Sequence, residues 1–172
     1  MGTERATQVA RGWLLVSALV ALLAACGGPP ESSPTPLPST LSYQGQTQTG
    51  QVGSFCWHDR CGELGGFPLP AATLTVPADA VLTLTFSGAS PPRTLDAAAY
   101  PLTKQSRTQT IAGGRILYPE GQTATPLPAA VVGRQAEITA RLPAGEYVLH
   151  IVVGETAPGE SSASYGFHLI VK

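Results

Sequence analysis

The chain has 172 residues, of which 43% are hydrophobic and 12% are charged, and its formal net charge at pH 7 is −1. This length is enough for one domain with its own core. The basic side chains are scattered along the chain and form no basic run, which excludes an electrostatic nucleic-acid-binding surface.

The first 25 residues have the pattern of a secretion signal. Arg5 and Arg11 supply positive charge, and an uninterrupted apolar run follows at 12–23. The run is about a dozen residues long, whereas a membrane-spanning helix needs about twenty. A signal peptide at 1–25 is therefore predicted, and a transmembrane helix is not.

The end of this signal, Leu23-Ala24-Ala25-Cys26, resembles the lipobox of bacterial lipoproteins, in which signal peptidase II cuts before a cysteine that carries a diacylglyceryl group. The resemblance implies that Cys26 is lipidated and that membrane lipid is a partner of the protein. Two acyl chains anchor a protein stably. The implied location is the extracytoplasmic side of a bacterial membrane. The alternatives are a secretory signal cut at Ala25 and an uncleaved anchor.

A tether is predicted at 26–40, after the lipidated cysteine. Residues 29–40 (PPESSPTPLPST) are rich in Pro, Ser and Thr, a composition that buries no core and favours extended polyproline geometry. Such a disordered segment reaches roughly 35–40 Å. It would hold a domain at 41–172 away from the membrane.

From residue 41 onward, apolar and polar side chains alternate in short segments separated by Gly and Pro. This pattern predicts an all-β domain, a two-sheet antiparallel sandwich of immunoglobulin-like or related topology. Residues 142–147 resemble the Leu-Pro-x-Gly-x-Tyr run of such sandwiches, which implies that Tyr147 packs at a corner. Strands are predicted at 73–76, 81–86, 93–99, 135–142, 147–153 and 165–171, with a hairpin at 107–118 that turns at Gly113-Gly114.

Two cysteines remain if Cys26 carries lipid. In an oxidising compartment Cys56 and Cys61 are predicted to form a disulfide that braces a short loop. The alternative is a metal site of Cys56, His58 and Cys61, which requires reduced thiols and a fourth ligand.

The segment Gly53-Ser54-Phe55-Cys56-Trp57, followed by Cys61, resembles a set of uncharacterised bacterial lipoproteins and exported proteins. These carry a Gly-Ser/Thr-Tyr/Phe-Cys-Trp…Cys segment near the start of a β-domain. They commonly have Val-Asp after the second cysteine, where this chain has Gly62-Glu63. The resemblance implies a cell-surface location and no particular activity.

Neither an enzymatic activity nor a cofactor is predicted. The chain has no Gly-x-Ser-x-Gly elbow, no His-Glu-x-x-His motif and no phosphate-binding Gly loop. Ser54, His58 and Asp59 lie close in sequence, but residues this close along strands and turns rarely meet the geometry of a catalytic triad. No pair stands out among the carboxylates that glycoside hydrolysis would require. Those considered are Asp59, Glu63, Asp96 and Glu120.

A two-histidine metal site is a further hypothesis. A hairpin of the last two predicted strands places His150 opposite His168, with both side chains on the outward face. Cross-strand partners are about 5 Å apart, near enough to share a metal ion. The competing interpretation is that both are ordinary surface residues.

These patterns predict a cell-envelope lipoprotein that displays a non-enzymatic binding or interaction module of unknown ligand. The candidate binding residues are Trp57, His58, Asp59 and Arg60, within the braced loop at 55–66; further contact loops are expected at 119–130 and 154–162. Trp57 either packs against the disulfide or anchors a surface glycan or an envelope protein. An accessory or inhibitor domain for an envelope enzyme is the alternative.

Overall fold

In a computed structural model of the chain, the described residues are 36–57, 60–87, 92–154 and 161–172, and they form strands and no helix. The prediction of an all-β antiparallel sandwich is confirmed. No helix in these ranges is long and apolar enough to cross a membrane. The predicted signal peptide, Cys26 and most of the predicted tether lie outside the described residues.

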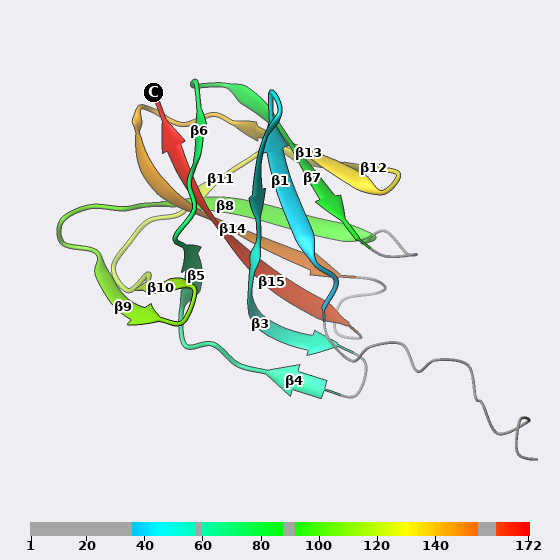
Figure 1. Cartoon of the computed structure of the whole chain (residues 1–172), viewed down its shortest axis with the longest axis horizontal. Helices are drawn as coiled ribbons and strands as arrows, with labels where there is room; N and C mark the ends of the chain where they lie inside the picture. The colour runs from blue at the N-terminus through cyan, green and yellow to red at the C-terminus, as the bar shows by residue number, and fades with distance from the viewer. Residues whose placement is uncertain (1–35, 58–59, 88–91, 155–160) are drawn as a thin grey trace, which may run out of the picture. The chain divides into compact units, whose positions relative to one another are not determined.

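Two large sheets form the sandwich (Figure 1). The five-stranded sheet has the order β12-β13-β7-β1-β2, and the seven-stranded sheet has the order β11-β8-β14-β15-β3-β4, with β6 paired to β15. Every pairing is antiparallel except that of β6 with β15. The strands are β1 (Ser39–Tyr43), β2 (Gln46–Thr49), β3 (Gln51–Trp57), β4 (Arg60–Gly62), β5 (Phe67–Pro70), β6 (Leu74–Val76), β7 (Ala80–Phe86), β8 (Thr94–Pro101), β9 (Arg107–Ile111), β10 (Gly114–Tyr118), β11 (Thr125–Pro126), β12 (Ala129–Val132), β13 (Gln135–Ala140), β14 (Gly145–Gly154) and β15 (Ser162–Val171).

The main core lies between the two large sheets and is filled by the apolar positions of the alternating strands. Because side chains alternate between the two faces of a strand, one apolar residue in two is enough to line the core. Every side chain that this pattern predicts to face inward in five strands is buried: Leu74, Val76, Leu82, Leu84, Phe86, Ala136, Ile138, Ala140, Leu142, Tyr147, Leu149, Ile151, Val153, Tyr165, Phe167, Leu169 and Val171.

The folded domain begins before residue 41. Strand β1 starts at Ser39, and Leu37 packs against the core. The Tyr165 hydroxyl donates a hydrogen bond of 2.7 Å to the Leu37 carbonyl oxygen. The last residues of the predicted tether are therefore part of the sandwich.

Several strands have no counterpart in the predicted set, namely β1 to β5, β11 and β12. They are short or consist largely of polar residues and Gly, so their apolar alternation is weak. The predicted hairpin at 107–118 is present as β9 and β10, but it turns at Ala112-Gly113, one residue earlier than expected. Gly113 has a φ of 82°, which favours glycine there.

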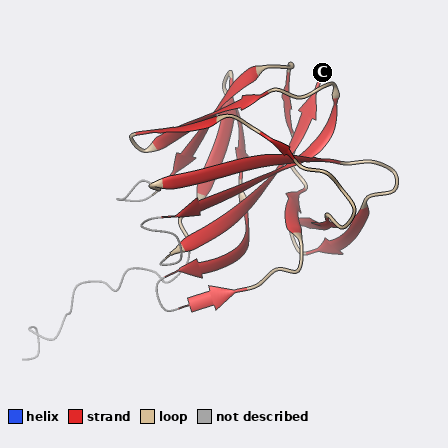
Figure 2. Ribbon diagram, turned by 180° about the vertical axis from the view of Figure 1, so that it is seen from behind, coloured by secondary structure: helices blue, strands red, loops and turns tan. Residues whose placement is uncertain are grey.

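A third, three-stranded sheet of order β5-β10-β9 packs on the outer face of the seven-stranded sheet (Figures 1 and 2). Leu69 of β5, Leu117 of β10 and Val148 of β14 form a second buried cluster between them. The two-sheet prediction does not include this layer. Its presence means that part of the outer face of β14 and β15 is covered by protein.

Strand β5 crosses β15 at Gly166. A Cβ atom built on Gly166 would lie 1.7 Å from the Pro68 carbonyl oxygen, and these are both backbone positions that cannot swing aside. Glycine in the interior of a strand often marks such a close approach of another backbone. Gly166 is therefore the residue that lets β5 pass over the large sheet.

Tyr147 packs at a corner, as the resemblance of residues 142–147 implies. Its side chain is 6% exposed, and its hydroxyl donates a hydrogen bond of 3.0 Å to the Pro143 carbonyl oxygen, four residues upstream. The bond closes the turn that leads into β14.

Substitution Tyr147→Phe is expected to lower the free energy of unfolding by about 1 kcal/mol, because one hydrogen bond is lost while the ring stays buried. Urea denaturation measures the loss. Tyr118→Phe is the matched control: the Tyr118 hydroxyl lies 2.5 Å from Gln109 Oε1 at an exposed site, and a change below about 0.5 kcal/mol is expected there. Equal losses for the two variants would contradict a corner role.

Candidate functional site

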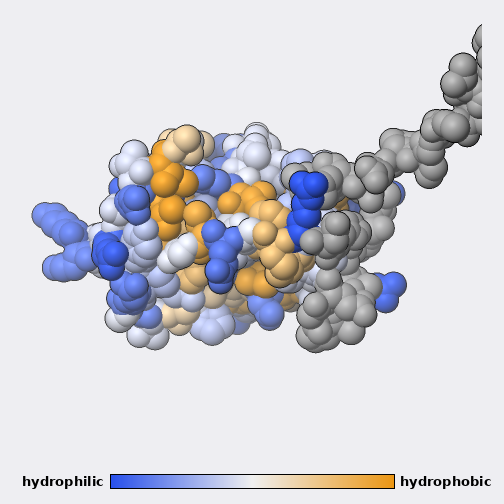
Figure 3. Space-filling view, turned by 90° about the horizontal axis from the view of Figure 1, so that it is seen from below, coloured by the Kyte–Doolittle hydropathy of each residue, from blue (hydrophilic) through white to orange (hydrophobic). Residues whose placement is uncertain are grey.

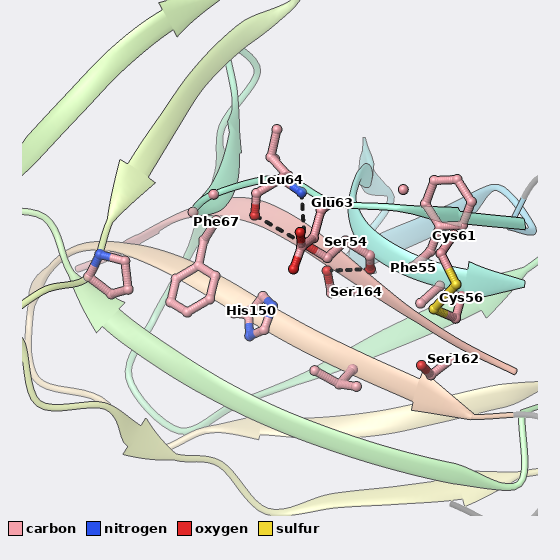
Figure 4. A pocket seen from close by; sticks show the side chains of 16 residues that line it. Ser54, Phe55, Cys56, Cys61, Glu63, Leu64, Phe67, His150, Ser162 and Ser164 are labelled. Carbon is pink, nitrogen blue, oxygen red and sulfur yellow. Dashed lines mark hydrogen bonds between the residues drawn. A yellow bond between two sulfur atoms is a disulfide. The ribbon is translucent and has the colours of Figure 1, made fainter. Parts of the chain in front are cut away.

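A cavity of about 750 Å³ opens where the β3–β4 hairpin and the start of β5 pass over β14 and β15 (Figure 4). Phe67 and His150 lie side by side at one end, and the Cys56–Cys61 disulfide lies at the other. Figure 3 views the side of the molecule where β4 and β9 lie, and apolar side chains are exposed in its middle. The cavity is lined by Ser54, Phe55, Cys56, Cys61, Gly62, Glu63, Leu64, Gly65, Gly66, Phe67, Pro119, His150, Val152, Ser162, Ala163 and Ser164.

His150 projects from β14 into this cavity. Its imidazole stacks on the Phe67 ring with a centroid distance of 4.0 Å and an interplanar angle of 25°, and the Tyr100 ring meets it edge-on at 6.4 Å. Burial lowers the pKa of His150 from 6.5 to about 4, because the charged form loses solvation. At neutral pH the side chain is an uncharged imidazole.

The position of His150 follows from its neighbours in the sheet. Its cross-strand partners are Gly166 on β15 and Ala98 on β8, and both are small. Gly166 also lets β5 approach, which brings Phe67 over the imidazole. The site therefore depends on the same glycine as the third sheet.

Hydrogen bonds hold the cavity wall at Ser54 and Leu64. The Ser54 hydroxyl accepts a bond of 2.9 Å from the Leu64 amide and donates one of 3.0 Å to the Leu64 carbonyl. The Ser164 hydroxyl donates a bond of 3.0 Å to the Ser54 carbonyl. The Ser54 hydroxyl is thus engaged with backbone, in keeping with a structural role.

The predicted disulfide is confirmed. Cys56 and Cys61 face one another across the β3–β4 hairpin, with their Cα atoms 4.1 Å apart. The bond occupies both sulfur atoms that the alternative metal site with His58 requires. It braces the edge of the cavity.

The candidate binding residues at 57–60 have different surroundings. Trp57 is 4% exposed, so its predicted burial is confirmed and the exposed-anchor interpretation is wrong. The side chain belongs to the main core, whereas the neighbouring Cys56 is exposed. The reason is that β3 belongs to the large sheet and turns this side chain into the core. Arg60 is exposed opposite Trp57 on β4, and His58 and Asp59 lie outside the described residues.

The predicted register of the last hairpin is wrong. His150 pairs with Gly166 and His168 pairs with Val148, so the two histidines are diagonal neighbours. His168 is 6% exposed, with Nε2 2.6 Å from Glu146 Oε1, because the third sheet covers this face around Val148. His150 contacts Phe67 instead. In the described ranges no three His, Cys, Asp or Glu side chains gather as a metal site.

The carboxylates considered for hydrolysis lie apart. Glu63 lines the cavity, whereas Asp96 lines a second cavity of about 360 Å³ that also contacts His150. Glu120 forms an exposed ion pair of 3.2 Å with Arg107. Asp59 is outside the described residues, and the other three acids do not share one cavity.

Comparison with known proteins finds no matching protein family, no matching curated protein and no matching solved structure.

Two distinctive residues of the site, His150 and Gly166, are the ones that sequence reasoning misplaced or missed. Gly166 within an alternating strand is a sequence signal for close backbone approach. The contact of Phe67 with His150 has no such signal, because Phe67 belongs to a four-residue strand that contains Pro68 and Pro70.

Proposed function

We propose that this protein is an exported lipoprotein, anchored through a diacylglyceryl group on Cys26 to the extracytoplasmic side of a bacterial membrane, and that its β-sandwich is a non-enzymatic binding module. The lipobox-like segment, the tether composition and the Cys56–Cys61 disulfide support the location. The ligand-binding role rests on one observation, the open cavity beside the braced hairpin. Its volume lies within the range typical of small-molecule sites.

The cavity has the composition of a binding site more than of a catalytic one. Phe55, Phe67 and Val152 supply apolar surface, and the few polar side chains include one titratable base that is uncharged at neutral pH, His150. The Ser54 hydroxyl is bonded to backbone on both its donor and acceptor sides. A rigid wall with a few fixed polar groups favours selective binding.

Cysteine substitution tests the anchor. Full-length protein expressed in bacteria with labelled palmitate is expected to carry the label and to sediment with membranes, and Cys26→Ser is expected to lose both properties. The double variant Cys56→Ser/Cys61→Ser is the matched control and keeps the label, because its lipidation site is intact. A label that survives Cys26→Ser would contradict the anchor.

A second candidate function is that of an accessory or inhibitor domain for an envelope enzyme. The observation that favours it is strand β12, which ends the five-stranded sheet and leaves Val132 62% exposed. Exposed edge strands pair readily with another chain. Crosslinking in native membranes tests this function. One stoichiometric protein crosslinked through β12 would support it, and recovery of polysaccharide or of nothing would count against it.

A further inference from the structure

The cavity beside His150 has a donor and acceptor set that selects for one kind of ligand. A neutral imidazole has one nitrogen that donates and one that accepts a hydrogen bond. Among the described residues neither nitrogen of His150 has a hydrogen-bond partner, while its ring is held by stacking on Phe67 at 4.0 Å. The group is oriented and has both functions free, which matches a hydroxyl group, itself both donor and acceptor.

The charges around the cavity act against an anionic ligand. Among the described lining residues there is no Lys or Arg, and Glu63 is the one acidic side chain. An incoming carboxylate, phosphate or sulfate would meet Glu63 without a compensating cation. Uncharged ligands are favoured, because they avoid this repulsion.

The walls combine apolar and polar surface. Phe55, Phe67 and Val152 provide apolar contacts, and Ser162 lies on the same lining. A pyranose ring has the matching character, with C–H groups on its faces and hydroxyl groups around its edge. The volume of about 750 Å³ is enough for one or two such rings of a longer chain.

We propose that this cavity binds an uncharged saccharide unit of an envelope glycan, with His150 hydrogen-bonded to a sugar hydroxyl and the apolar wall against the sugar face. The inference rests on the proposed binding function and names its ligand class. His150 is the residue that selects the hydroxyl, and Glu63 is the residue that rejects acidic sugars.

The test uses the full chain solubilised in detergent and an array of immobilised oligosaccharides of neutral hexoses and N-acetylhexosamines, each paired with a uronic-acid or sulfated counterpart. The wild type is expected to bind a neutral glycan at least about tenfold more tightly than its acidic counterpart, which is a difference in binding free energy of about 1.4 kcal/mol. His150→Phe, which keeps an aromatic ring beside Phe67, is expected to weaken binding about tenfold or more. Glu63→Gln is expected to reduce the discrimination against the acidic counterpart.

Two further variants separate loss of the site from loss of the fold. Phe67→Leu removes the stacking partner of His150 and is expected to weaken binding while the protein remains folded by circular dichroism. Val81→Ala is the matched control: Val81 on β7 is 52% exposed and does not line the cavity, so this variant leaves binding unchanged. Neutral-glycan binding that is insensitive to both His150→Phe and Phe67→Leu would overturn the site assignment.

Failure of this inference can be told apart from failure of the proposed function. Tight binding of acidic glycans that His150→Phe abolishes would overturn the restriction to uncharged saccharides and leave the binding function standing. Absence of binding across the array overturns the inference. The binding function itself fails only if crosslinking in native membranes also recovers no ligand or partner.

Discussion

Gly166→Ala is expected to lower the free energy of unfolding by about 3 kcal/mol, the upper part of the range for overpacking a well-packed site. The added methyl group would lie 1.7 Å from the Pro68 carbonyl oxygen and 2.8 Å from its Cγ, so β5 has to move away from β15. Movement of β5 also disturbs Leu69 in the second buried cluster. Chemical denaturation followed by circular dichroism measures the loss.

Gly65→Ala is the matched control for this substitution. A Cβ atom on Gly65 meets nothing within 4 Å, so the same chemical change is expected to alter stability by less than about 0.5 kcal/mol. Because β5 carries Phe67, Gly166→Ala should also expose the imidazole of His150 and move its pKa back toward the ordinary value. A stable Gly166→Ala variant would show that β5 does not cross β15 in contact.

The second large effect is a loss of stability as the pH falls from 6.5 toward 4. In the folded protein the pKa of His150 is about 4, whereas in the unfolded chain it takes the ordinary value of 6.5. Between these values the unfolded chain binds more protons than the folded one, so acid favours unfolding. Because the ring is only partly buried, solvent screening limits the contribution to about 2 kcal/mol.

His150→Phe isolates this contribution. The wild type and the variant share all carboxylates, so the difference between their stability changes from neutral pH to about pH 4 reports His150 alone. The free energy of unfolding of the variant is expected to fall by about 2 kcal/mol less than that of the wild type. Urea denaturation at the two pH values gives the difference. An NMR titration of the His150 ring with a midpoint near 6.5, or equal acid sensitivity of the two proteins, would refute the assignment.

Long strands of the domain could be predicted because they carry a strict alternation. In β14 and β15 each inward position is apolar over seven or more residues, so only one face of each strand can be assigned to the core. The disulfide could also be predicted, because Cys56 and Cys61 are the pair that remains if Cys26 carries lipid.

The candidate site could be predicted only in part from the sequence. The braced loop at 55–66 was identified, and its residues Phe55, Cys56, Cys61 and Glu63 do line the cavity. For Trp57 the sequence leaves two interpretations, a buried and an exposed side chain, because the apolar alternation of a single short strand does not show which face is buried. The predicted register places His150 opposite His168. Period two assigns the faces of the strands, but the offset between them depends on the length of the connection between Gly154 and Ser162.

The sequence by itself determined the all-β class, the inward faces of the long strands and the pairing of Cys56 with Cys61, because these depend on local periodicity and on the number of available thiols. Only the tertiary structure decided that a third sheet covers the outer face of β14, and that His150 meets Phe67. That contact depends on Pro68 and Gly166, which are nearly a hundred residues apart in the chain, and no local pattern encodes the close passage of two distant backbones.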